Sequence, residues 1–546
     1  MFTITPESQI DLDREIAQLE QDLASLKRRR NALSPVSQLP PEILARIFFL
    51  TLPFVDLAER RLSTEEEPRL EQAKGRLCAV SSRWRETAFA APELWRDIHI
   101  RYHTKAQYLN FALDNIGEKQ TISLDADTVG KTIPEVRRVL EAGNTRVLKR
   151  VSLGVGEETM HRIFQQLEAR SEGTEELVLR SHQIRGRLSN LQTVATVFPQ
   201  LRKLRLLNWR IPKDLHQLST ITHLVFKEIR GLTEEDLRKL LVFFKTAGHI
   251  ESLELQFQQT AAVFPENILG SAEVELHHLK RFKVQADNTL VLLALLTAIR
   301  LPAEIEVVVI LAEDKSNELS RQLTSAVSLA CSHILPPEEL GLSKVIVLTP
   351  DGAKQLPQYV GFQGFWSGKP EQLLKLVMAV PKDNAVPSNP NTQICQLYSL
   401  PFTSSANPWL LSRLQDMSIG FQPSFTFWQL IADIPTLRRL KLNAWHLDDC
   451  FLRILRGDED THSPSVPRIP FPVLQSLQIF IVTPDLDIDY ARALAHALKR
   501  RTAGAGEGKL APIREINFKL CTLQIDEETD VLLLSVASDI TWLMKE

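Results

Sequence analysis

The 546-residue sequence predicts an α/β protein in which a small all-helical region precedes a long array of alternating strands and helices. Three observations lead to this fold class. A heptad pattern and a proline-bounded apolar segment occupy the first hundred residues, a short apolar phrase recurs from about residue 120 onward, and 83 residues are leucine. We expect an N-terminal helix over residues 1–34, a helical module over 35–100 and the array over 101–546.

Composition and charge exclude several classes of protein. The 64 basic and 67 acidic residues give a net charge of −3, so the chain as a whole has no electrostatic preference for nucleic acid or anionic membrane. With 44% hydrophobic residues, it is not a largely disordered chain. Five scattered cysteines form no disulfide framework, and the N-terminus lacks the features of a signal peptide. No apolar stretch reaches the roughly 20 residues of a membrane span. We therefore expect a cytoplasmic or nuclear location.

The first segment carries a heptad pattern. Five apolar residues spaced by 4, 3, 4 and 3 lie on one helix face, which is typical of a coiled coil: Leu12, Ile16, Leu19, Leu23 and Leu26. Because the pattern covers only about two and a half heptads, two interpretations stay open. The face packs against the same chain, or it binds a second helix in self-association. The basic run from Lys27 to Arg30 fits either a helix C-terminus with cations near its dipole or a nuclear-import patch.

A second apolar helix is predicted from about residue 41. Pro40 and Pro41 fit a helix start, and Glu42 lies in the first turn, where a carboxylate faces the helix dipole. Pro53 is expected to end this helix. The acidic, polar insert 54–75 that follows predicts an exposed loop or a loose helix. Apolar residues then return at helical spacing and continue past a proline break: Leu77, Val80, Trp84, Ala88, Leu94, Trp95 and Ile98.

These anchors, taken in order, resemble an F-box. The match runs through Leu39-Pro40-Pro41-Glu42-Ile43-Leu44 with Ile47-Phe48, then Val80-x-x-x-Trp84-Arg85-x-x-Ala88, then Pro92-x-Leu94-Trp95. Together with the preceding heptad helix, the arrangement is similar to the F-box-like proteins abundant in mushroom-forming fungi. The resemblance covers residues 35 to about 100, and the insert 54–75 is longer than in a compact F-box.

The resemblance implies a three-helix module that binds the Skp adaptor of cullin–RING ubiquitin ligases of the SCF type. The residue types agree, because so short a helical hairpin carries more apolar surface than it can bury, and such surfaces are usually partner sites. The alternative is that the residues form the module's own core, which stays most open for Ile47, Val80 and Trp84. The predicted adaptor-binding residues are Leu39, Pro40, Glu42, Ile43, Leu44, Ile47, Phe48, Val80, Trp84, Leu94 and Trp95.

The phrase apolar-x-x-apolar-x-apolar recurs along the rest of the chain. Its copies begin at Leu148, Thr174, Leu201, Ile221, Ile250, Leu279, Leu414, Leu437, Leu474 and Ile513. This resembles a degenerate leucine-rich-repeat array, whose period is about 20–29 residues, and the resemblance implies an irregular solenoid. One strand-plus-helix unit cannot bury its apolar face alone, so neighbouring units stack around a shared core. The segment from Glu234 to Gly248 predicts one of the intervening helices.

Residues between the apolar positions face the opposite side of the predicted sheet, because side chains alternate along a strand. Those that form a mildly basic strip, suited to an acidic or phosphorylated segment of a protein target, are Lys203, Arg205, Glu254, Lys283, Arg439, Lys441, Gln478 and Asn517. The alternative is a solvated sheet face that tolerates any polar residue. The strip therefore marks candidate target-binding residues.

No motif for catalysis, metal or cofactor binding stands out. The segment before Lys509 lacks the first glycine and the Ser/Thr of a P-loop, and no H-E-x-x-H, zinc-ligand spacing or G-x-S-x-G is present. We therefore expect no enzyme and no cofactor. The predicted function is a substrate receptor, in which the module binds the Skp adaptor and thereby the cullin–RING ligase, while the array binds an unidentified protein target and supplies proximity. The alternative is a non-ligase interaction scaffold whose helical module caps the array.

Overall fold

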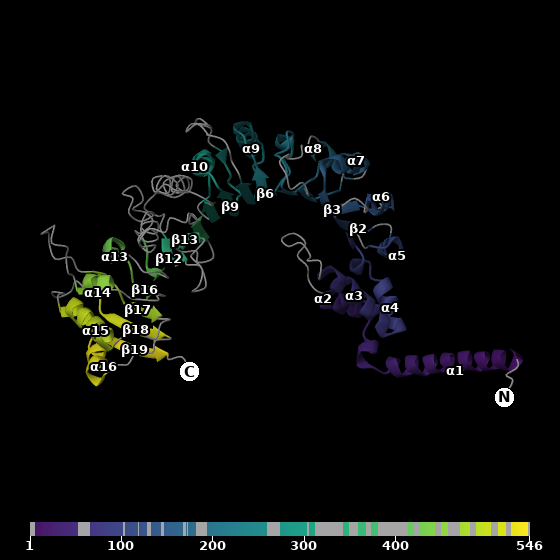
Figure 1. The fold of residues 1–546 in the computed structure, drawn as a ribbon, viewed down its shortest axis with the longest axis horizontal. Helices are drawn as coiled ribbons and strands as arrows, with labels where there is room; N and C mark the ends of the chain where they lie inside the picture. Colours follow the sequence, from purple (N-terminus) through teal and green to yellow (C-terminus); the bar gives the residue numbers. More distant parts are fainter. Residues whose placement is uncertain are drawn as a thin grey trace. The chain divides into compact units, whose positions relative to one another are not determined.

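The computed structural model is a mixed α/β protein, as predicted (Figure 1). It divides into two compact units. The first unit comprises residues 1–184 and 196–201, and the second comprises 185–195 and 202–546. The structure describes residues 6–52, 66–101, 104–117, 120–127, 133–142, 147–167, 171, 173–181, 194–258, 274–302, 305–311, 342–348, 359–366, 373–379, 413–419, 425–442, 449–456, 470–480, 488–503, 511–519 and 526–543.

The first unit begins with helices. They are α1 (Pro6–Ala32), the 3-10 turn η1 (Pro35–Gln38), α2 (Pro41–Thr51), α3 (Glu66–Val80), α4 (Ser82–Phe89) and the 3-10 turn η2 (Pro92–Leu94). The predicted N-terminal helix is therefore present, and α2 starts at Pro41 because a proline fits the first helical position. The predicted end of α2 at Pro53 lies outside the described residues, and the helix itself ends at Thr51.

From Glu66 onward the polar insert is helical, as part of α3, in agreement with one of its two predicted forms. One detail of the helical module differs from the sequence prediction. Val80 and Trp84, expected on one helix, lie on two, because α3 ends at Val80 and Ser81 caps a new helix. The Ser81 hydroxyl accepts a hydrogen bond from the Trp84 backbone N–H at 3.1 Å, which satisfies a donor that a helix start would otherwise leave unpaired.

An aromatic core holds the module together and joins it to the next helix. The rings of Phe48 on α2 and Trp84 on α4 lie 4.8 Å apart, centroid to centroid. Phe111, on α5 (Ala106–Ile116), packs edge-on against Phe89 and Trp95 at 4.9 and 5.1 Å. The indole N–H of Trp95 also donates to the Ala88 carbonyl at 2.8 Å, so the buried ring leaves no unpaired donor.

The strands of the first unit are parallel and pair in chain order. They are β1 (Asp97–Ile100), β2 (Thr121–Asp127), β3 (Val147–Val155) and β4 (Glu176–Ser181). Helices α5, α6 (Ile133–Ala142) and α7 (Glu157–Leu167) connect them and lie along one face of the strands (Figure 1). Strand β1 falls inside the segment predicted as purely helical, and it pairs with β2 so that Ile98 lies beside Leu124.

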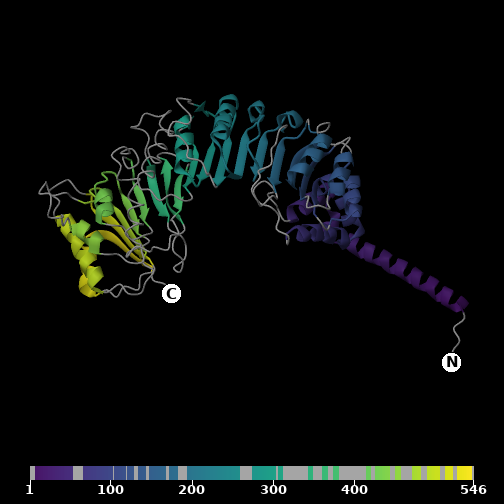
Figure 2. The same cartoon turned by 45° about the horizontal axis from the view of Figure 1, so that its top comes forward.

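The second unit continues the same arrangement. Its elements up to β11 are β5 (Lys203–Leu207), η4 (Leu215–Gln217), β6 (His223–Arg230), α9 (Glu234–Thr246), β7 (Ser252–Gln258), β8 (Val274–Glu275), β9 (Arg281–Ala286), α10 (Thr289–Ala298), β10 (Ile299–Arg300) and β11 (Glu306–Leu311). Strands β5, β6, β7, β9 and β11 pair in parallel and in this order, side by side in Figure 2. The predicted helix at Glu234 is confirmed as α9. The short helix α8 (Val194–Val197) spans the division between the units.

Three strands interrupt the parallel order. They are β12 (Leu342–Leu348), β13 (Tyr359–Trp366) and β14 (Leu373–Ala379). Strand β11 pairs in parallel with β14, β14 pairs antiparallel with β13, and β13 pairs antiparallel with β12. Strand β12 then pairs in parallel with β15. The sheet of the second unit is thus continued through a three-stranded insertion in reversed chain order. The leucine phrase also occurs in this insertion, at Leu342 and Leu373, although the sequence prediction names no copy there.

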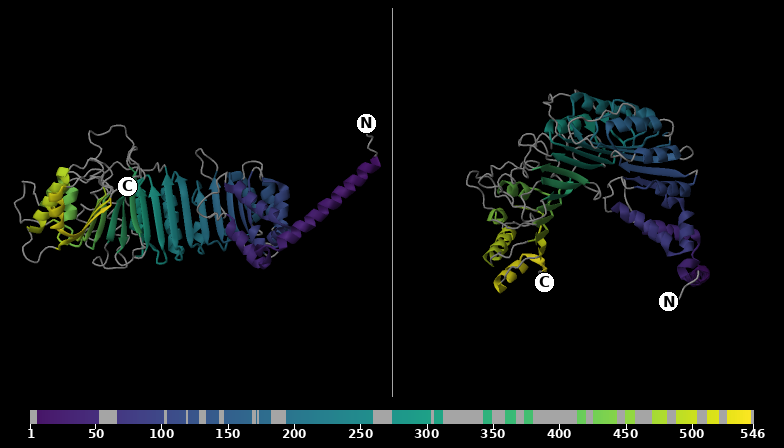
Figure 3. Two further views of the ribbon diagram at one scale, coloured as in Figure 1. Left: turned by 90° about the horizontal axis from the view of Figure 1, so that it is seen from below. Right: turned by 45° about the vertical axis from the view of Figure 1, so that its right-hand side comes forward.

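The C-terminal part returns to parallel pairing in chain order (Figure 3). It consists of β15 (Asp416–Ile419), α13 (Phe425–Ala432), β16 (Arg439–Leu442), α14 (Asp449–Arg456), β17 (Ser476–Phe480), α15 (Ile488–Ala503), β18 (Ile513–Lys519), α16 (Glu527–Leu534) and β19 (Ala537–Leu543). The helices lie along one face of the strands (Figure 1).

Each copy of the leucine phrase forms or enters a strand, as predicted, and its apolar side chains align into rows. One row contains Leu204, Leu224, Leu253 and Phe282, which are register partners on β5, β6, β7 and β9. All four side chains are at most 1% exposed. The residue that follows each of these four in its strand points to the other face of the sheet and is at least half-buried. The strands therefore alternate between an apolar face that packs against the helices and a polar face.

Replacing a row residue should destabilise several strands together. We expect Leu253→Ala to cost about 2–5 kcal/mol, because it leaves a cavity between β6, β7 and β9. Gln256→Ala, on the polar face of the same strand, should cost well under about 1 kcal/mol. Native-state hydrogen exchange of the β6, β7 and β9 amides measures the difference, since stacked units can open locally. Equal protection in the two variants would contradict the shared core.

Candidate functional site

The clearest apolar surface in the helical module is a stripe on α2. Ile43, Ile47 and Leu50, spaced one and two turns apart, are 50%, 37% and 67% exposed. On the adjoining side of the same helix, about a third of a turn away, Leu44 and Phe48 are completely buried. Because a folded module normally covers side chains of this size, the α2 stripe (Ile43, Ile47 and Leu50) is a candidate partner site.

The other predicted adaptor-binding residues divide between surface and core. Pro40 and Glu42 are exposed beside the stripe, and Val80 at the end of α3 is 54% exposed. Leu39 is half-buried, and its carbonyl accepts a hydrogen bond from Arg83 at 2.5 Å. Trp84 is half-buried against Phe48.

Four predicted contact residues belong to the module's own core. Leu44 and Phe48 are completely buried, and Leu94 and Trp95 are each 4% exposed. These side chains can therefore support the surface, but in this structure they do not reach it. Leu50 is a surface residue that the sequence prediction omitted, although its position seven residues after Ile43, two helical turns on, places it in line with the stripe.

On the polar face of the second unit, the predicted target-binding residues lie among opposite charges. Arg205, Glu254 and Lys283 share one register row across β5, β7 and β9. Glu254 Oε1 lies 2.7 Å from Lys283 Nζ and 3.1 Å from Lys227 Nζ. Partial burial opposes the charge of Glu254, but the two ammonium groups outweigh it and hold the pKa of this carboxyl below its usual value.

The remaining candidates show the same local compensation. Arg439 forms an ion pair with Asp416, and Lys441 Nζ lies 4.4 Å from the centre of the Phe480 ring. Asn517 donates to Glu515 and shares a register row with Gln478 and Lys441. Lys203 and Arg205 on β5 are the exceptions, since neither has a charged partner within the described part of the chain.

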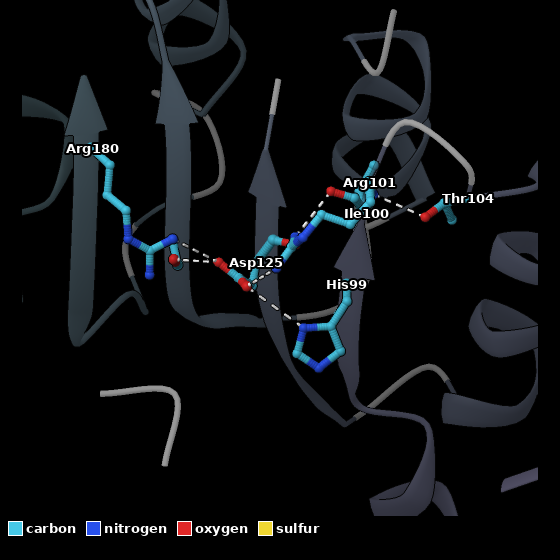
Figure 4. A network of polar contacts seen from close by, with 7 residues as sticks. His99, Ile100, Arg101, Thr104, Asp125 and Arg180 are labelled. Carbon is cyan, nitrogen blue, oxygen red and sulfur yellow. Dashed lines mark hydrogen bonds and ion pairs between the residues drawn. The ribbon is translucent and has the colours of Figure 1, made fainter. Parts of the chain in front are cut away.

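A buried polar network in the first unit had no signal in the sequence prediction. Asp125, in the middle of β2, is 5% exposed and accepts hydrogen bonds from Arg101 Nη2 at 2.7 Å and from the Ser152 hydroxyl at 2.5 Å (Figure 4). Arg180 Nη1 approaches the same carboxylate at 3.5 Å. His99 Nδ1 lies 3.7 Å away, beyond a good hydrogen-bond distance. The residues come from four adjacent strands or their ends, so only strand pairing brings them together.

Electrostatics keep Asp125 ionised despite its burial. Burial alone would raise the pKa of the carboxyl, but His99 and the guanidinium groups of Arg101 and Arg180 outweigh it and lower the pKa well below the usual range. The Arg101 guanidinium is itself only 9% exposed. A buried ion pair of this kind fixes the register of the strands that carry it, and removing one partner leaves an uncompensated charge.

Within the described residues, no group of three or more His, Cys, Asp or Glu side chains is placed to hold a metal ion. None of the described helices combines the length and apolar character required to cross a bilayer. No protein-family model matches the sequence, and no curated protein matches it significantly. A functional assignment therefore rests on the chain's own residues and surfaces.

Neutralising Asp125 should destabilise the first unit in a pH-dependent way. We expect Asp125→Asn to cost about 3–5 kcal/mol at pH 7, because Arg101 stays buried without its counter-charge. Since the folded pKa lies below the unfolded value of about 3.9, the carboxylate stabilises the fold above that pH and loses this effect as the pH falls below it. Chemical denaturation at several pH values should show the difference between the two proteins shrinking steadily as the pH falls below about 5.

The matched control for this measurement is Ser152→Ala. It removes one hydrogen-bond donor to Asp125 but no charge, and should cost only about 1 kcal/mol. A difference between parent and Asp125→Asn that stays constant from pH 7 to pH 2 would contradict the proposed ion-pair energetics.

Proposed function

We propose that this chain is a substrate-receptor subunit of an SCF-type cullin–RING ubiquitin ligase. In this proposal the helical module (residues 35–100) is an F-box that binds the Skp adaptor, and the strand–helix array is an irregular leucine-rich-repeat solenoid that binds a protein target. The chain contributes proximity and orientation to ubiquitin transfer, whose chemistry other subunits perform.

The observation that carries the proposal is the α2 stripe. Ile43, Ile47 and Leu50 stay exposed although the module has a complete aromatic core of its own around Phe48 and Trp84. An amphipathic helix that keeps a second apolar face in water is suited to burying it in a groove of a partner. Pro40 and Glu42, both exposed at the start of the same helix, extend this surface with polar contacts.

The polar face of the array is the corresponding target site. Its strands present Lys203 and Arg205 without charged partners among the described residues, next to the compensated group Lys227, Glu254 and Lys283. The positive charge of Lys203 and Arg205, which no acidic neighbour in the described residues balances, suits an acidic or phosphorylated segment of a target. Strand backbones hold these side chains at fixed spacing, which supports recognition of an extended peptide.

A second candidate function also has a specific observation in its favour. Phe89 and Trp95 of the module pack against Phe111 of α5, and β1 pairs with β2. These contacts suit a module that covers the first strand–helix unit of an interaction scaffold. Such a cap needs no adaptor, so binding to the Skp adaptor separates the two functions.

The decisive experiment is binding of the purified chain to a Skp adaptor. We expect the parent to bind, and Ile43→Asp with Ile47→Asp to weaken binding at least about tenfold, because charges replace exposed apolar contacts without entering the core. Gln107→Asp with Asn110→Asp, both exposed on α5, adds the same charge elsewhere and should bind like the parent. Circular dichroism verifies that all three proteins are folded. A folded parent that does not bind would exclude the receptor function.

The cap function has its own test. Deleting residues 35–100 removes β1 and the aromatic partners of Phe111, and should expose both an apolar ring and the hydrogen-bonding edge of β2. If the module is a structural cap, the shortened chain should aggregate during size-exclusion chromatography. A monodisperse shortened chain would contradict the cap function.

A further inference from the structure

The heptad face of α1 is uncovered along its whole length. Its five residues, Leu12, Ile16, Leu19, Leu23 and Leu26, are between 50% and 62% exposed. The sequence leaves two interpretations of this face open. The first, packing against the same chain, is not seen among the described residues. Helix α1 is continuous from Pro6 to Ala32, so the face is a straight apolar stripe about 20 Å long between Leu12 and Leu26 (Figure 3).

We infer that α1 binds α1 of a second copy of this chain as an antiparallel two-stranded coiled coil. The spacing places Ile16 and Leu23 at the a positions and Leu12, Leu19 and Leu26 at the d positions of the heptad. Two such faces cover each other by inserting these side chains between those of the facing helix. The inference rests on α1 alone and is independent of the proposed ligase function.

The residues beside the stripe are charged, and their sign changes along the helix. In the first two heptads all four flanking e and g positions are acidic: Asp13, Glu15, Glu20 and Asp22. In the third heptad both are basic: Lys27 and Arg29. All six side chains are exposed, and neither basic residue forms an ion pair within α1. In coiled coils, such flanking charges determine partner choice and helix orientation.

An antiparallel arrangement joins the acidic and basic ends. With Leu19 opposite Leu23 of the second copy and Ile16 opposite Leu26, four apolar layers form around the two-fold axis. In this register Lys27 faces Asp13 of the second copy and Arg29 faces its Glu15, and the symmetry repeats both pairs at the other end. Only the central Glu20 and Asp22 meet their own copies, and there water screens the repulsion.

A parallel arrangement uses the same stripe less favourably. It sets Glu15 against Glu20 of the second copy on both sides, and these repulsions offset the attraction between Asp22 and Lys27. It also places Arg30, at the next a position after Leu26, against Arg30 of the second copy, whereas the antiparallel register places it opposite Leu12. The charge pattern therefore selects the antiparallel form.

Sedimentation of the full-length chain tests the association. We expect a monomer–dimer equilibrium between about 1 and 100 μM, because four apolar layers give only a weak coiled coil. Leu19→Asp with Leu23→Asp should leave a monomer throughout this range. Gln21→Asp with Ser25→Asp, which adds the same charge on the outer face, should dimerise within about threefold of the parent. A parent that stays monomeric overturns the inference. This holds even if the apolar stripe of α1 binds a different protein.

Charge reversal tests the orientation. Asp13→Lys with Glu15→Lys should weaken an antiparallel dimer at least about tenfold, because the introduced lysines face Lys27 and Arg29. The same change should strengthen a parallel dimer, because the lysine introduced by Glu15→Lys would face Glu20 there. Adding Lys27→Glu and Arg29→Glu to that chain should restore antiparallel association to near the parent value. Strengthening by the first pair, or no recovery by the second, overturns the antiparallel form.

Discussion

The parallel strands in the described part of this protein depend on their neighbours to keep their apolar side chains out of water. The side chains of Leu224 and Leu253 are completely buried, although each belongs to a strand of only seven or eight residues. Their environment is supplied by the adjoining strands in register and by the helices along one face. A single unit has no separate core, so removing a neighbour exposes apolar surface that costs about 25 cal/mol for each Å². This dependence makes the strand–helix units cooperative over short distances.

The same strands carry a second set of constraints on their other face. In the second unit, the Glu254 carboxylate lies between the ammonium groups of Lys227 and Lys283, and these charges remain partly hydrated. In the first unit, the corresponding pair of Arg101 and Asp125 is withdrawn from water, so its partners must meet with correct geometry. One face therefore supplies the stabilising burial, while the charges of the other favour one alignment of the strands.

Local sequence patterns predicted the elements, and long-range pairing supplied what they missed. The leucine phrase identifies β5, β6 and β7 because apolar and polar residues alternate along a half-buried strand, and this alternation is visible in consecutive residues of the sequence. The insertion of β12, β13 and β14 could not be anticipated in this way, because its reversed order follows from pairing across distant segments, which no local phrase indicates. A short strand such as β1 has too few residues for a distinct pattern.

The candidate sites follow the same division. Glu42 and the α2 stripe could be anticipated because spacing along a helix decides which side chains share a face. The separation of Leu44 and Phe48 from Ile43 and Ile47 could not, because which face of α2 is covered depends on where α4 lies. Asp125 is the extreme case, since its partners are 24 to 55 residues away along the chain. Nothing near Asp125 in the sequence marks it as buried.

The reversed insertion of β12, β13 and β14 has a consequence for how the second unit folds. From β5 to β11, and again from β15 to β19, the strands of the main sheet pair in chain order, with only β8 and β10 pairing outside it, so these stretches can form from segments close together in the sequence. Strand β11 instead pairs with β14, and β12 pairs with β15, so both pairings join segments that are far apart along the chain. We expect the two parallel stretches to form first and their union to set the folding rate. Pairing through the insertion is then the slow step in the formation of a sheet whose other parts assemble from neighbouring segments of the chain.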